Sequence, residues 1–135
     1  MKKLKKNNKG FSLVELIVVV LIIAIIAVAL APQVIKWVDQ ARKNTIKSNQ
    51  ATIKSAISTA VAEFMAAGHA IENGTEISVK GTEATCADNT ALAEKINPVI
   101  ADNKDTTYTY EYTVDADGGI TTGYVKNGEN TVTLD

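Results

Sequence analysis

The sequence has little of the material from which catalytic sites, metal sites and disulfides are built. Its 135 residues include one cysteine, Cys86, so an intrachain disulfide is excluded. With one histidine, His69, the chain also has too few Cys and His ligands for a typical zinc site. A Ser/His or Cys/His catalytic pair would have to use His69, which we interpret instead as an exposed loop histidine. We therefore expect no catalytic residue, no metal and no cofactor, and hence no enzyme.

Basic and acidic residues are segregated along the chain, although the net charge is only −1. Residues 1–10 contain five lysines and no acid, and residues 36–54 contain five basic residues and one acid. From Ser55 onward, four lysines are outnumbered by thirteen acidic residues. Phosphate binding needs clustered Lys and Arg, so we expect no nucleic acid as the main partner. The basic residues of 36–54 are interpreted as a solvated helix face.

A long apolar run follows the first lysines. From Phe11 to Ala31 only Ser12 and Glu15 are polar. A helix of this length spans about 30 Å, which is the thickness of a bilayer core. The preceding lysines place the N-terminus in the cytoplasm and the C-terminal part outside. The run therefore predicts a single-pass membrane segment.

Three interpretations of this segment compete. Ala29-Leu30-Ala31 has the small-x-small form of a secretory cleavage site, but Pro32 would then begin the mature chain. A plain membrane anchor explains the length of the run but not its polar detail. The third interpretation starts from residues 9–15, Lys-Gly-Phe-Ser-Leu-Val-Glu, where a basic leader ends in glycine and a single Glu interrupts the run.

This string resembles the processing site of type IV prepilins and pseudopilins, with a class III-type leader. The resemblance covers about the first third of the chain and implies that prepilin peptidase cuts after Gly10 and methylates the new terminus, Phe11. It implies that Glu15 serves assembly by neutralising the Phe11 amine of a neighbouring subunit. Pro32 falls where many of these proteins carry a proline, and it should kink the helix. The absence of a disulfide resembles the pilins of Gram-positive bacteria.

Glu15 also has a physical argument of its own. A carboxylate near the centre of a bilayer costs about 2.5–3.5 kcal/mol on insertion scales. An ionisable residue at such a place is interpreted as functional, with a partner expected. The alternative is an incidental Glu whose carboxylate reaches interfacial water.

The rest of the chain predicts an α+β fold in which a long N-terminal helix packs on a small antiparallel β-meander. After Pro32 apolar residues recur at three- and four-residue steps as far as Phe64, and Gly68 is a natural C-cap. We expect these parts: leader 1–10, transmembrane and assembly helix 11–32, amphipathic stem 33–68, and globular head 69–135 with a three-stranded C-terminal sheet.

Within the head, residues 69–105 have an irregular pattern apart from a short helix near Ala91–Ile96 that Pro98 ends. Residues 108–114 alternate tyrosine or valine with polar residues, which predicts a strand whose tyrosines pack on the stem. Strands at 120–126 and 131–134 follow, separated by turns. Asp115-x-Asp117-Gly118 is a fragment of a calcium loop, but a polar turn is the simpler interpretation.

Together these features predict a structural subunit, a major pilin of a type IV pilus. The expected partners are identical subunits in a helical filament, prepilin peptidase, a membrane assembly platform, and lipid before assembly. We expect a single-pass precursor in the cell membrane, followed by a filament on the cell surface. The alternative is a pseudopilin of a type II secretion or DNA-uptake machine.

Overall fold

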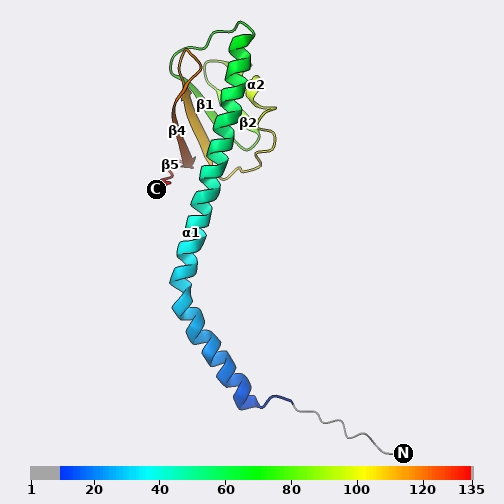
Figure 1. The fold of residues 1–135 in the computed structure, drawn as a ribbon, viewed down its shortest axis with the longest axis vertical. Helices are drawn as coiled ribbons and strands as arrows, with labels where there is room; N and C mark the ends of the chain where they lie inside the picture. The colour runs from blue at the N-terminus through cyan, green and yellow to red at the C-terminus, as the bar shows by residue number, and fades with distance from the viewer. Residues whose placement is uncertain (1–9, 135) are drawn as a thin grey trace, which may run out of the picture. The chain divides into compact units, whose positions relative to one another are not determined.

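The computed structural model describes residues 10–134, and its contacts divide the chain into two units, one ending at Ala41 and the other beginning at Arg42. We call the second the folded unit. A long helix precedes a small antiparallel sheet, which confirms the predicted α+β class (Figure 1). The elements are α1 (Leu13–Ala66), β1 (Thr75–Lys80), β2 (Glu83–Cys86), α2 (Thr90–Ile96), β3 (Thr109–Val114), β4 (Ile120–Asn127) and β5 (Asn130–Thr131).

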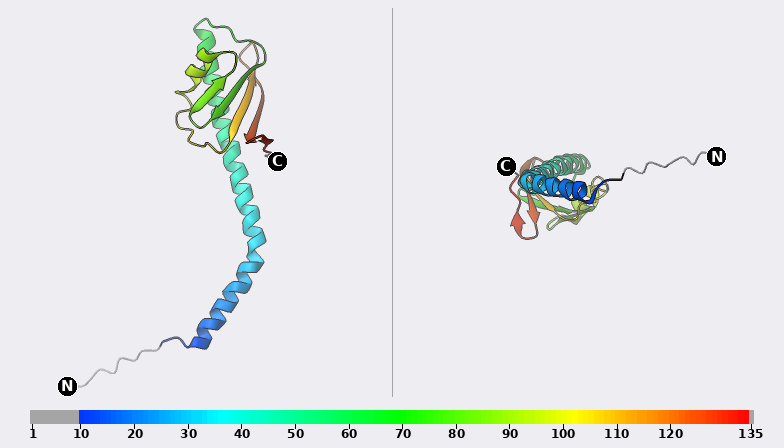
Figure 2. Two further views of the ribbon diagram at one scale, coloured as in Figure 1. Left: turned by 180° about the vertical axis from the view of Figure 1, so that it is seen from behind. Right: turned by 90° about the horizontal axis from the view of Figure 1, so that it is seen from below.

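The sheet has five strands in the order β2-β1-β3-β4-β5, and all neighbours are antiparallel. In the folded unit α1 lies in front of the sheet in Figure 1, and the sheet lies in front of α1 in the reverse view of Figure 2. One face of the sheet is thus covered by helix. α2 lies beside α1, where Lys95 Nζ is 3.5 Å from Glu63 Oε2.

The core forms between α1 and the covered face of the sheet. From Ile46 to Phe64 the apolar stripe predicted for the stem is buried, and Val61 joins it; the buried side chains are Ile46, Ile53, Ile57, Ala60, Val61 and Phe64. Ile35 and Val38, at the start of the predicted stripe, are exposed instead. Tyr110 and Tyr112 of β3 are buried against it, which confirms that the tyrosines face the stem. Gly123 pairs with Tyr112 across the strands, and a Cβ at Gly123 would lie 2.9 Å from the Tyr112 ring. Glycine here lets the ring lie flat over the neighbouring strand.

The predicted helix ends are confirmed. Gly68 has φ +92°, its N–H donates to the Met65 carbonyl at 2.9 Å, and the His69 N–H donates to the Phe64 carbonyl at 3.3 Å. This is a Schellman cap, which favours glycine because of its positive φ. The short helix is α2, capped by the Asn89 side chain, which accepts from the Leu92 N–H.

The prediction that residues 69–105 are irregular apart from that helix was wrong. Thr75–Lys80 and Glu83–Cys86 form a hairpin, and β1 of that hairpin joins the sheet beside β3. Ile77 and Val79 alternate with polar residues in β1, but the run is only six residues long. Its pairing partner β3 is distant in sequence, so the local pattern carried too little signal. The last predicted strand, 131–134, is reduced to Asn130–Thr131.

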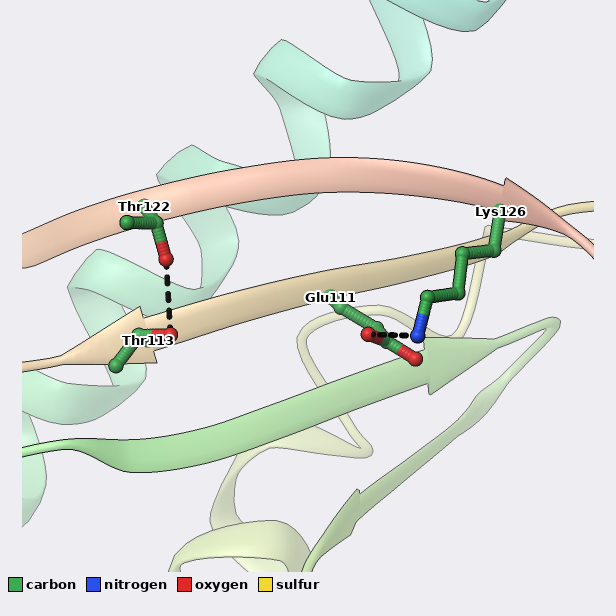
Figure 3. A network of polar contacts seen from close by, with 4 residues as sticks. All are labelled: Glu111, Thr113, Thr122 and Lys126. Atoms are coloured by element: carbon green, nitrogen blue, oxygen red, sulfur yellow. Dashed lines mark hydrogen bonds and ion pairs between the residues drawn. The ribbon is translucent and has the colours of Figure 1, made fainter. Parts of the chain in front are cut away.

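The face of the sheet opposite α1 is polar. Lys126 Nζ lies 2.8 Å from Glu111 Oε2, and the Thr122 hydroxyl donates to the Thr113 hydroxyl at 2.9 Å (Figure 3). The hydrogen bond to the Glu111 carboxylate raises the pKa of Lys126. These contacts are part-exposed, so we assign them little stability.

Replacing Tyr112 with Phe is expected to destabilise the folded unit by about 1–2 kcal/mol, because a buried hydrogen bond is lost. The Tyr112 hydroxyl donates to the Gln50 carbonyl of α1 at 2.7 Å. Urea unfolding of a soluble fragment measures the effect. Tyr124→Phe, on the exposed face, is the matched control and should change the free energy of unfolding by less than about 0.5 kcal/mol. Equal losses from both variants would contradict this role for Tyr112.

A fragment from Lys36 onward is expected to be soluble and monomeric. It lacks most of the exposed apolar helix but keeps the whole core between α1 and the sheet. Circular dichroism should show helix and strand, and gel filtration should show one monomeric peak. Aggregation without those signals would contradict the stem-and-sheet packing as an independent folding unit.

Candidate functional site

The N-terminal part of α1 presents a continuous exposed apolar surface. Every residue from Gly10 to Arg42 is exposed, including Leu16, Ile23 and Val38. Within the described residues, α1 is the one helix long and apolar enough to cross a membrane, and its most apolar window is 0% buried. An apolar surface of this size needs lipid or protein to cover it. The segment fits a membrane-anchored precursor.

Ser12 and Glu15 form a capping box at the start of this helix. The Glu15 N–H donates to the Ser12 hydroxyl at 3.2 Å, and the Ser12 N–H donates to Glu15 Oε2 at 3.0 Å. Each side chain therefore satisfies a backbone donor that the first turn leaves without a helical partner. This role of Glu15 was not predicted from the sequence. The signal was present, since Ser-x-x-Glu before an apolar run is typical of such a cap.

The cap also fixes where the Glu15 charge lies. Its carboxylate is in the first turn of α1, where the positive end of the helix dipole favours an anion. The Glu15 oxygen accepts from the Ser12 N–H, and Ser12 directly follows Phe11 in the chain. A positive amine at Phe11 would therefore lie near the helix end that holds this carboxylate.

Gly10 and Phe11 lie outside the helix and are exposed, with the Phe11 side chain 91% exposed. A Cβ at Gly10 would meet no atom within 4 Å, and its φ is not positive. Within residues 10–134, nothing in the fold therefore requires glycine at position 10. The leader predicted for residues 1–10 lies, apart from Gly10, outside the described residues.

Pro32 is inside α1, which continues on both sides of it without interruption. The kink at Pro32 stays a prediction.

The other candidates from the sequence have structural roles. Cys86 is buried, and burial raises the pKa of its thiol, which lowers its reactivity. Asp115 Oδ1 accepts from the Asp117 and Gly119 N–H groups at 3.0 and 2.7 Å, so this carboxylate holds a turn. His69 stacks on Phe64 with 4.5 Å between ring centroids. Residues 10–134 contain no group of three or more acidic, Cys or His side chains arranged to hold a metal.

Comparison with known families places one match on this part of the chain. The prokaryotic N-terminal methylation motif matches residues 5–31, which include Gly10, Phe11 and Glu15. Neither a curated protein nor a solved structure matches the chain. The resemblance inferred from the leader and the apolar run is confirmed, and residues 5–31 carry the class III leader of type IV pilins and pseudopilins.

Proposed function

We propose that the chain is a structural subunit, the major pilin of a type IV pilus. The precursor enters the membrane, is cut after Gly10, is methylated at Phe11, and polymerises into a surface filament. The observation that carries this proposal is the methylation motif on the N-terminal part of α1, where every apolar side chain is exposed, while the C-terminal part of the same helix belongs to a folded unit. A subunit of this form gains stability by exchanging lipid for the helices of its neighbours.

Cleavage changes the chemistry of the helix start. It removes the lysine-rich leader and creates an ammonium group on Phe11, next to the capping box of Ser12 and Glu15. A capping role alone needs only a hydrogen-bond acceptor, which a neutral Gln also supplies. The charge of Glu15 supports a second role, in which it pairs with the Phe11 amine of a neighbouring subunit.

Several partners follow from this proposal. Prepilin peptidase recognises the leader, a membrane assembly platform extracts the subunit, and identical subunits cover its helix in the filament. The chain has no catalytic role in this scheme, and nucleic acid is not its main partner. A pseudopilin, which carries the same motif, is the alternative function. Electron microscopy distinguishes long surface filaments from the short assemblies of a pseudopilin.

Intact-mass spectrometry of sheared filaments tests the proposal. The subunit mass is expected to match a chain that begins at Phe11 and carries one added methyl group. The physical reason is the position of Gly10, which is exposed and ends a basic leader just before the helix. A mature chain that begins at Pro32 would show signal-peptidase processing and would contradict the proposal.

A further inference from the structure

Two grooves lie on different flanks of α1 within the folded unit. The first, about 250 Å³, lies between α1 and β4, and its charged lining residues are Lys47 and Lys54. Each residue advances about 100° around a helix, so these two lysines lie within about 20° of the same line along α1. Both are exposed, and neither forms an ion pair with a described residue. We call this surface the basic flank.

The second groove, about 280 Å³, lies between α1 and the loop of residues 99–105. Its apolar part consists of Ile53, Ala56, Val99 and Ile100. Its charged lining residues are Asp102, Asp105 and Lys104, and the polar rim is completed by Asn49, Thr52 and Asn103. We call this surface the acidic flank.

The two aspartates of the acidic flank differ in how their carboxylates are held. Asp105 is fixed, because its carboxylate accepts from the Thr107 N–H at 2.9 Å and from the Tyr110 hydroxyl at 3.3 Å. Asp102 is exposed on the loop. The groove thus offers one carboxylate held within the fold and one at the surface.

The acidic flank fits the side chain of a lysine. Lysine has an apolar stem of four methylenes and a charged head, so it can lie along apolar surface while its ammonium reaches a polar rim. Ala56 and Val99, the accessible apolar residues of the groove, would contact the stem, and Asp102 or Asp105 would accept from the ammonium. A groove of about 280 Å³ is small for an organic ligand, since typical ligand pockets begin at about 300 Å³.

The two flanks lie on opposite sides of α1. In Figure 1, β4 and the yellow loop that includes residues 99–105 lie on opposite sides of the helix. On α1 itself, Lys47 and Lys54 lie on one side of the buried Ile53, and Asn49, Thr52 and Ala56 lie on the other. Complementary surfaces on opposite sides of one subunit make a heterologous contact, which repeats into an open helical polymer.

We propose that the basic flank of one subunit docks on the acidic flank of the next, with Lys54 entering the groove beside residues 99–105. This inference rests on the proposed function and names the contact between neighbouring folded units. It adds a lateral contact to the packing of the apolar helices. Charge complementarity then sets the register of neighbouring subunits.

A membrane surface and a nucleic acid are the competing partners for the basic flank. Lys47 and Lys54 are seven residues apart, so they are separated by about 10 Å along α1. If α1 enters the membrane, Lys47 and Lys54 lie at different distances from the lipid headgroups. A partner that runs along the helix can contact both lysines, so we favour such a partner. The acidic balance after Ser55 disfavours a phosphate backbone.

Charge reversal in the full chain tests the proposal. Lys54→Glu and Asp102→Lys should each lower sheared-filament yield at least about tenfold relative to cleaved, membrane-inserted subunit. The double variant Lys54→Glu/Asp102→Lys should recover most of that loss. Thr52→Trp, at an exposed helix position, should also lower the yield because the indole fills the acidic groove. Lys80→Glu, an equal charge change on β1, is the matched control and should leave the yield within about twofold.

Cysteine cross-linking tests the geometry. A full chain with Lys54→Cys and Asp102→Cys should give a ladder of dimers, trimers and longer oligomers when its filaments are oxidised. Chains with either substitution alone should give no ladder, and the buried native Cys86 should not contribute.

The outcomes separate this contact from the proposed function. Native-like yield of both charge-reversal variants, together with no ladder, would overturn the contact and leave the pilin proposal standing. Normal filaments of Lys54→Glu that have lost DNA binding would overturn it in favour of a nucleic-acid surface. Absence of any filament from the native chain would overturn both.

Discussion

Replacing Glu15 with Val is expected to abolish most filament formation while leaving membrane insertion and leader cleavage intact. Insertion should be preserved or improved, because the change removes the one formal charge in the apolar run. Cleavage should persist, because it depends chiefly on Gly10. Assembly should fail, because breaking a buried charge pair costs about 3–5 kcal/mol. That cost corresponds to a filament yield lower by a factor of about 100 or more.

Two further variants separate the charge of Glu15 from its place in the capping box. Glu15→Gln keeps an acceptor for the Ser12 N–H but removes the charge, so its filament yield should fall nearly as far as that of Glu15→Val. Ser12→Ala removes half of the cap but keeps the charge. It should cost only about 1 kcal/mol of helix stability and leave most filaments. Full yield from Glu15→Gln would show that the cap alone explains Glu15.

Co-expression indicates where the charge pair lies. If the carboxylate of one subunit meets the amine of another, a Glu15→Val subunit can still offer its own amine to a native neighbour. Mixed expression should then restore part of the filament yield, with variant subunits present in the filaments by mass spectrometry. Filaments built entirely from native subunits in the mixture would contradict pairing between subunits.

Replacing Gly10 with a bulky residue such as Leu is expected to block leader cleavage and, with it, filament formation. The structure gives no internal reason for glycine here, since a Cβ at Gly10 would meet no atom within 4 Å. The requirement would therefore come from the close fit of a peptidase around the cut. Uncleaved precursor should accumulate in the membrane, as judged by intact mass and by immunoblotting of membrane fractions.

Gly10→Ala provides the graded control. A single methyl group should permit partial cutting, so cleaved and uncleaved chains should both be present. Neither variant should change the folded unit, which begins at Arg42. Efficient cutting of Gly10→Leu at the same bond would contradict recognition of position 10 by size.

Much of the fold followed from local pattern. The α1 stripe that ends at Phe64, the cap at Gly68 and the alternation of residues 109–114 each produced the expected element. Such features can be predicted from the sequence because the period of a helix, the period of a strand and the conformation of a glycine depend on a few neighbouring residues. The hairpin of β1 and β2 was not predicted. β1 has a short alternating run, and its place beside β3 depends on pairing with residues 29 to 39 positions away.

By itself the sequence determined the membrane-length apolar run, the processing motif, and a long helix followed by a small antiparallel sheet. These depend on composition and short spacing, which the chain carries before it folds. Tertiary structure decided that Thr75–Lys80 enters the sheet, that Tyr112 binds the Gln50 carbonyl, and that Lys54 and Asp102 lie on opposite flanks of α1. Contacts between segments far apart in sequence are selected by burial of the whole core, so no local pattern could predict them.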